Sequence, residues 1–232
     1  MKGLGIVFTG GEGPPPQAIR RLLEGAGEAL LVAADSGLML AEAAGLKPDW
    51  IIGDMDSLGS GSLDSDSLDS EQRLRSYPAD RVIRHVADKD FTDTELALDL
   101  LWDKGCAEAW IVGGGGGRLD HLFGIRDLFE RERFPRRWLT AAEDIYCIDG
   151  DGAGSTAAGL TLTIEQGGVV SVFPLGDGLW KVHSTGLKWP LDNVRWKRGV
   201  YGLSNVVAES EITINARQGR FMIIVEGVWR RA

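Results

Sequence analysis

The sequence is poor in the features that mark disulfide-bonded, exported and membrane-spanning proteins. Cys106 and Cys147 are its only cysteines, too few for a disulfide framework or a cysteine-based zinc site. No stretch approaches the run of about 18 apolar residues that a membrane helix requires. The first residues also lack a basic segment followed by a long apolar one. We therefore expect a protein of the reducing cytoplasm that neither crosses nor binds a membrane.

Positive charge is scarce as well. Lysine and arginine number 25 against 34 aspartates and glutamates, which gives a formal net charge of -9. Nucleic-acid binding depends on clustered basic side chains, so this composition argues against a nucleic-acid partner. Carboxylates also repel a polyphosphate unless cations reverse the local charge. Any hypothesis that involves a nucleotide therefore requires Mg2+, and the same negative field would attract a cationic second substrate.

The common nucleotide-binding signatures are missing too. The predicted first strand, residues 4–9, runs into Gly10-Gly11-Glu12-Gly13 without a Gly-x-Gly-x-x-Gly pattern or a Walker lysine. Glycines at such a point can bring the backbone close to a phosphate, and they are equally typical of a plain turn. This stretch alone leaves both interpretations open.

The segment around which the chain is organised runs from Asp49 to Leu58. Its apolar part is a predicted strand that ends in Gly53, and Asp54 and Asp56 follow one residue apart. Open α/β sheets bind their ligands at the carboxyl ends of the strands, where both carboxylates would lie. Such a pair can hold Mg2+ against phosphate oxygens, although an isolated Asp-x-Asp is more often a polar turn.

Two further predicted strands end in acidic residues. Asp35 follows the strand 29–34, where capping of the next helix is an alternative role. Asp93 follows the strand 81–86, and either Thr92 or Asp93 is expected to cap the helix that begins there. Because these strands should share one sheet edge with Asp54, the acids are expected to lie close together.

The strand 109–112 leads into five consecutive glycines, Gly113 to Gly117, and then into Arg118-Leu119-Asp120-His121. So many glycines permit positive φ angles and a close backbone approach, which a bound nucleotide would explain. Arg118 is placed to reach phosphate, and Asp120 to join the other carboxylates. His121 is as compatible with a structural role as with a catalytic one.

Strands and helices alternate over about the first 140 residues, and the pattern then changes. In the first part, residues 1–145, the pattern predicts an α/β domain with a mostly parallel, Rossmann-like sheet. Its predicted helices lie at 17–25, at 38–44, after Thr92 and at 118–133, and its last predicted strand lies at 138–141. The second part, residues 146–232, predicts an antiparallel β-sandwich with strands at 160–165, 169–173 and 220–226 and a turn at Gly167-Gly168. Residues 59–72 are rich in Ser, Asp and Gly and predict a solvated loop.

The ordered set of motifs resembles the thiamine pyrophosphokinase family over nearly the whole chain. The motifs are Asp35-Ser36-Gly37, Gly53-Asp54-Met55-Asp56-Ser57, Thr92-Asp93, Gly116-Gly117-Arg118-Leu119-Asp120-His121, Thr185-Gly186-Leu187-Lys188-Trp189-Pro190-Leu191 and Ser204-Asn205. Each is weak by itself, whereas the set in this order is specific. The stretch after Leu58 looks longer than the connection usual in that family.

The resemblance implies transfer of pyrophosphate from ATP to thiamine, with release of AMP, in a homodimer whose active sites form between subunits. It also implies site residues. Asp54, Asp56 and Asp93 resemble the Mg2+ ligands, and Asp35 and Asp120 complete the catalytic acidic group. The ATP site corresponds to Gly10, Gly11, Asp35, Thr92, Gly116, Arg118 and Asp120, and the thiamine site to Trp189 as a stacking surface with Ser204 and Asn205 as polar contacts.

Some alternatives stay open. Trp189 is either a packed core residue or an aromatic surface for a flat heterocycle, and either Asp120 or Asp35 is the candidate base. A different ATP-dependent transferase would release ADP instead of AMP. A non-catalytic nucleotide or thiamine sensor would show no turnover, although so many like charges at one site are costly for a binding module.

Overall fold

The computed structural model describes residues 3–54, 72–86, 90–150 and 159–231. Within these limits the chain forms two compact units, each treated separately below. Unit 1 comprises residues 1–128 and 138–142, and unit 2 comprises residues 129–137 and 143–232. The predicted Asp56 and most of the predicted loop 59–72 lie outside the described residues, and the domain division after residue 145 stays a prediction.

Unit 1 is built on a parallel sheet. Its strands are β1 (Leu4–Thr9), β2 (Ala29–Ala34), β3 (Trp50–Gly53), β4 (Val82–Arg84) and β5 (Glu108–Gly113), with the short β6 (Arg137–Leu139) beyond β5. The order β5-β1-β2-β3-β4 is parallel at every pairing. Strand β1 is apolar and almost wholly buried, which is typical of a strand covered on both faces.

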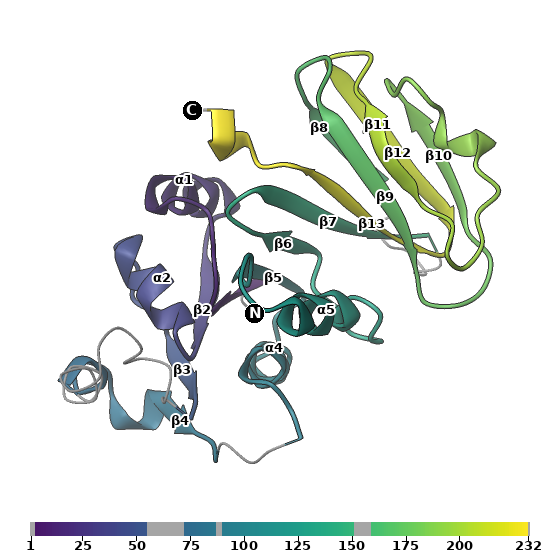
Figure 1. Ribbon diagram of the computed structural model, residues 1–232. Helices are drawn as coiled ribbons and strands as arrows, with labels where there is room; N and C mark the ends of the chain where they lie inside the picture. Colours follow the sequence, from purple (N-terminus) through teal and green to yellow (C-terminus); the bar gives the residue numbers. More distant parts are fainter. Residues whose placement is uncertain (1–2, 55–71, 87–89, 151–158, 232) are drawn as a thin grey trace. The chain divides into compact units, whose positions relative to one another are not determined.

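Among the described residues, the helices that flank this sheet include α1 (Pro16–Ala26), α2 (Gly37–Ala43), α4 (Asp93–Asp103) and α5 (Leu119–Leu128). Figure 1 shows α1 and α2 on one side of β1 to β3 and α4 and α5 on the other. Every βα connection therefore delivers its first residues to the carboxyl edge of the sheet, the expected place for a ligand.

Unit 2 consists of antiparallel strands. They are β7 (Glu143–Asp149), β8 (Gly159–Thr163), β9 (Val169–Leu175), β10 (Lys181–Thr185), β11 (Gly202–Val206), β12 (Glu211–Gln218) and β13 (Arg220–Glu226). Two sheets result, ordered β11-β9-β13-β7 and β10-β12-β8. One core is shared between them, with Val172 and Phe221 from the first sheet and Ile214 from the second fully buried. Short 3-10 helices complete the described chain at Ala79–Arg81, Leu191–Asn193 and Val228–Arg231.

The predicted fold class is confirmed, with differences in detail. Strands β1, β2 and β13 have the predicted bounds, whereas the helix predicted to reach residue 133 ends at Leu128. Strand β4 is shorter than predicted, and β7, β10, β11 and β12 lie outside the predicted strands. None of the helices in the described ranges is long and apolar enough to cross a membrane.

Candidate active site

A cavity of about 830 Å3 opens at the carboxyl edge of the sheet of unit 1. Four of the five predicted carboxylates line it, and so do the residues predicted to bind ATP; these are Asp35, Asp54, Asp93 and Asp120, with Gly10, Gly11, Thr92, Gly116 and Arg118. The fifth carboxylate, Asp56, belongs to the part of the chain that is not described. The sequence motifs of unit 1 therefore meet in one place although they come from five different connections.

Asp35 is held by an unusual backbone at the end of β2. Its φ is +46°, a left-handed conformation, and its N–H donates to the carbonyl of Ile52 at 3.0 Å. Gly53, with φ +150°, has no side chain to obstruct it, and a Cβ there would lie 1.8 Å from Oδ1 of Asp35. Ser36, not Asp35, is the N-cap residue of α2. The carboxylate of Asp35 is therefore directed toward the end of β3, and the capping alternative is wrong.

Thr92 and Asp93 begin helix α4. The Thr92 hydroxyl accepts from the N–H of Glu95 at 3.3 Å, and the Thr92 N–H donates to the Glu95 carboxylate at 2.6 Å, which completes a capping box. Two residues after Thr92, the hydroxyl of Thr94 hydrogen-bonds the hydroxyl of Thr9 at 2.6 Å, and both residues line the cavity. The start of α4 is thus fixed to β1, which sets the place of Asp93 in the cavity.

The two glycine-containing connections of the cavity contact each other. The backbone N–H of Glu12 donates to the carbonyl of Gly115 at 2.7 Å, and the N–H of Gly115 donates to the carbonyl of Glu12 at 2.9 Å. Gly113 has φ +101°, and a Cβ there would lie 2.2 Å from the carbonyl oxygen of Thr9. Close approach between the connections therefore explains part of the glycine run, independently of any ligand.

Arg118 and Asp120 form a bidentate ion pair at the mouth of the cavity. Nε and Nη2 of Arg118 donate to the two carboxylate oxygens at 3.1 and 2.5 Å, and the N–H of His121 donates to Asp120 at 3.0 Å. These hydrogen bonds, that of Arg118 foremost, lower the pKa of Asp120 below its usual range. Asp120 is therefore ionised and already paired, and the pair leaves Nη1 of Arg118 available to contact a phosphate.

The donor set suits Mg2+. Among the described residues, which do not include Asp56, no three or more His, Cys, Asp or Glu side chains form a metal-ligand group. Asp35, Asp54 and Asp93 nevertheless face one cavity, and Oδ1 of both Asp35 and Asp93 is buried. Carboxylate oxygens are the ligands that Mg2+ prefers, and a bound cation would offset the cost of burying them together.

Trp189 in unit 2 is a surface residue. Its side chain is 53% exposed, so the packed-core interpretation is wrong. Nζ of Lys188 lies over the indole, 4.7 Å from its centroid. Ser204 is also exposed, with φ +55°, and its N–H donates to Ser171 Oγ at 3.1 Å. Asn205 differs from both, because it is buried and its side chain is engaged by the backbone of Trp189.

Several cavity residues, Thr9 and Phe91 among them, had no place in the predicted site. Thr9 and Phe91 both line the cavity, and the Phe91 side chain is 52% exposed. Thr9 is the last residue of β1, so its position before Gly10 at a strand end was an available signal. No sequence pattern distinguishes Phe91 from an ordinary surface aromatic.

Comparison with known proteins gives one consistent result. The model described as "Thiamin pyrophosphokinase, catalytic domain" matches residues 22–136, and the model described as "Thiamin pyrophosphokinase, vitamin B1 binding domain" matches residues 160–221. Thiamine pyrophosphokinase of Bacillus subtilis (strain 168) is 27% identical over 206 residues, covering 84% of this chain and 86% of the relative.

Comparison with solved structures gives proteins of the same description. The crystal structure of thiamin pyrophosphokinase from Geobacillus thermodenitrificans is 27% identical, with a TM-score of 0.70 and 97% of each chain covered. Yeast thiamin pyrophosphokinase, at 16% identity, has the same TM-score, with 99% of this chain and 87% of that one covered, and shows the shared fold alone.

Proposed function

The chain belongs to the thiamin pyrophosphokinase family, since the models of both family domains match it, and on this premise we propose that it transfers the pyrophosphoryl group of ATP to the hydroxyl of thiamine. The products are thiamine diphosphate and AMP. The observation that carries the proposal is the cavity of unit 1, where four carboxylates, a glycine-rich connection and an arginine converge within the segment that the catalytic-domain model matches.

ATP binds in this cavity with its phosphates toward the carboxylates. Asp54, Asp56 and Asp93 would hold Mg2+, which would neutralise the triphosphate and stabilise negative charge on the transferred group. The backbone of Gly10, Gly11 and Gly116 lets the nucleotide approach closely. Thr92 lies beside it, and Arg118 keeps its pair with Asp120 while Nη1, which that pair does not use, donates to a phosphate oxygen.

The chain's own carboxylates orient the thiamine hydroxyl and accept its proton. Asp120 is the poorer base of the two candidates, because its hydrogen bonds to Arg118 lower its pKa. Asp35, the other candidate, lines the cavity with Oδ1 buried. We therefore favour Asp35 as the base and assign Asp120 to holding Arg118.

Thiamine is bound through unit 2, the part that the vitamin B1 binding-domain model matches. Trp189 offers an exposed indole, and Lys188 covers one of its faces, so the other remains for the flat pyrimidine of thiamine. Ser204 is an exposed residue of β11 and supplies a hydroxyl. The family resemblance also supports a cytoplasmic homodimer in which active sites form between subunits.

The test is formation of thiamine diphosphate from thiamine and ATP, measured chromatographically with Mg2+ and with a chelator. We expect turnover with Mg2+ only. Asp93→Asn should reduce it by at least about a hundredfold, in the range of lost transition-state charge stabilisation. Asp99→Asn removes the same charge from an exposed position of the same helix and should leave turnover unchanged. Absence of thiamine diphosphate from the wild-type reaction would refute the proposal.

A further inference from the structure

The segment that carries Trp189 is held in unit 2 by backbone contacts and, in addition, by side chains at two fastening points. It runs from Lys188 to the 3-10 helix Leu191–Asn193, between β10 and β11 in sequence. The backbone N–H of Lys188 donates to the carbonyl of Val206 at 2.8 Å, and Leu187 forms an isolated antiparallel β-bridge with Val207. The exposed indole therefore belongs to a segment whose main chain contacts Val206 and Val207 just before Trp189.

The first fastening point is Asn205, which is 4% exposed. Its side-chain nitrogen donates to the carbonyl of Trp189 at 2.6 Å, and its side-chain oxygen accepts from the N–H of Trp189 at 3.2 Å. The same oxygen accepts from the N–H of Val206 at 2.9 Å. The amide therefore pairs with both backbone groups of Trp189, which no other neutral side chain of this size can do.

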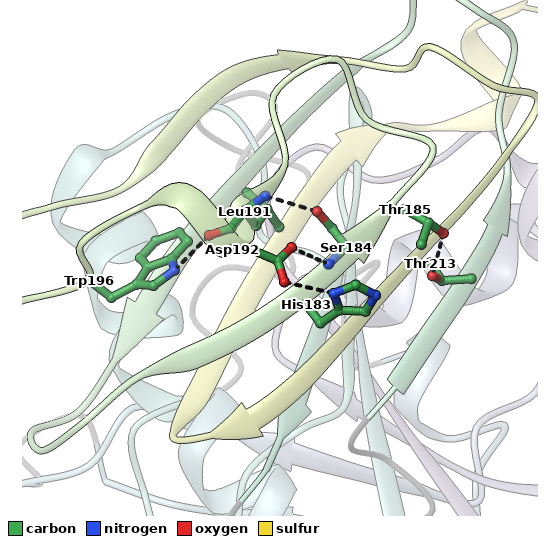
Figure 2. A network of polar contacts seen from close by, with 7 residues as sticks. All are labelled: His183, Ser184, Thr185, Leu191, Asp192, Trp196 and Thr213. Atoms are coloured by element: carbon green, nitrogen blue, oxygen red, sulfur yellow. Dashed lines mark hydrogen bonds and ion pairs between the residues drawn. The ribbon is translucent and has the colours of Figure 1, made fainter.

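The second point lies a few residues further on, and Figure 2 shows it. The carboxylate of Asp192 accepts from Nδ1 of His183 at 2.7 Å and from the N–H of Ser184 at 3.1 Å. Leu191 donates its N–H to Oγ of Ser184 at 2.9 Å, and its carbonyl accepts from the indole of Trp196 at 3.2 Å. This network joins the segment to β10 without involving Trp189.

We propose that Asn205 is a positioning residue for thiamine and acts through the backbone of Trp189, not by touching the substrate. The inference deepens the proposed function and rests on it. Asn205 is 4% exposed, its side-chain oxygen accepts from two backbone N–H groups, and one of its two side-chain N–H groups donates to Trp189, so burial and these contacts direct the amide to the backbone and away from a ligand. Its effect on thiamine is to fix the indole in advance, so that binding does not have to order it.

Substitution of Asn205 removes the first fastening point only, so its effect should be confined to thiamine binding. Asn205→Ala leaves the Trp189 N–H and carbonyl without their side-chain partners, while the Asp192 network still holds the end of the segment. We expect the KM for thiamine to rise about tenfold, a range set by lost hydrogen bonds and lost preorganisation. The kcat at saturating thiamine and the KM for ATP should change by less than about twofold, because neither depends on how thiamine is captured.

The decisive experiment is a double-mutant cycle of Asn205→Ala and Trp189→Ala, with thiamine affinity measured by calorimetry alongside the kinetics. If Asn205 acts through Trp189, the double variant binds thiamine no more weakly than Trp189→Ala alone. A full additional loss in the double variant would overturn the inference, because it would mean that Asn205 contacts thiamine directly. Thr213→Val is the matched control, since it removes the hydroxyl pair with Thr185 at 2.7 Å in the same unit and should leave thiamine affinity unchanged.

A conservative variant separates positioning from general damage to the unit. Asn205→Asp keeps the acceptor for the two N–H groups, but its ionised form presents a second acceptor to the Trp189 carbonyl. Protonation restores the donor, so the ratio of variant to wild-type KM for thiamine should fall as the pH is lowered. A ratio independent of pH would count against the inference. If Trp189→Ala alone leaves thiamine affinity unchanged, the thiamine role of Trp189 fails instead, and the two failures remain distinguishable.

Discussion

Substitution of Gly53 by alanine tests how the acidic group is assembled. The new Cβ would lie 1.8 Å from Oδ1 and 2.7 Å from Cγ of Asp35. To restore an ordinary non-bonded contact, the carboxylate oxygen must move by about 1.5 Å or more. The backbone of Asp35 cannot readily follow, because its N–H is bonded to Ile52 at 3.0 Å in a left-handed conformation. The group that the new Cβ meets first is therefore the Asp35 carboxylate.

The substitution is expected to lower both the free energy of unfolding and the turnover rate. Alanine at φ +150° is strained, and such strained backbone costs about 1 to 3 kcal/mol of stability. A misplacement of about 1 Å at a reacting group costs on the order of a hundredfold in rate. Gly45→Ala is the matched control, since Gly45 has φ +71° but its nearest neighbour, Nη1 of Arg20, would be 3.8 Å from the new Cβ. It should lose about 1 to 2 kcal/mol from left-handed backbone strain and no activity.

Both variants are compared by denaturant unfolding and by steady-state turnover at saturating substrates. Gly53→Ala should be folded at the assay temperature and lose about two orders of magnitude in kcat. Turnover equal to that of Gly45→Ala would show that the contact between Gly53 and Asp35 does not position a catalytic group, and it would refute this part of the reasoning.

Three other predictions concern the metal site, a buried hydrogen bond and a thiol. Asp56→Asn should abolish turnover while the unfolding transition stays that of the wild type; near-normal activity with Mg2+ would remove Asp56 from the metal ligands. Thr94→Val should lower the free energy of unfolding by about 1 to 3 kcal/mol, because it leaves the buried Thr9 hydroxyl without its partner at 2.6 Å. Burial raises the pKa of Cys147 to about 12, so a thiol reagent at neutral pH should modify this residue only after unfolding, and rapid labelling of native protein would contradict its placement.

Local sequence patterns determine much of unit 1. The apolar runs 4–9 and 29–34 become β1 and β2 with the predicted bounds, because a strand buried on both faces is a continuous apolar segment bounded by turn residues. Thr92 caps α4, one of the two caps predicted from the acids that follow it. The gathering of Asp35, Asp54, Asp93 and Asp120 was also predictable, since parallel strands share one carboxyl edge.

The contacts within unit 2 were harder to predict. Strand β12 contains a period-two pattern, with Ile212, Ile214 and Ala216 buried, yet its flanks resemble loop sequence. The pairing of Asn205 with Trp189 links residues 16 apart and depends on the path of the chain between β10 and β11. The left-handed conformation of Asp35 also arises from tertiary packing, because nothing in Asp35-Ser36-Gly37 excludes ordinary helix capping.

The most direct test of the central claim is phosphorus NMR of the purified protein incubated with Mg2+, ATP and thiamine. Transfer of a pyrophosphoryl group predicts that AMP and thiamine diphosphate appear together in equal amounts, without accumulation of ADP. Formation of ADP with thiamine monophosphate, or an unchanged ATP spectrum, would contradict the claim and leave the cavity of unit 1 with a different reaction or with none.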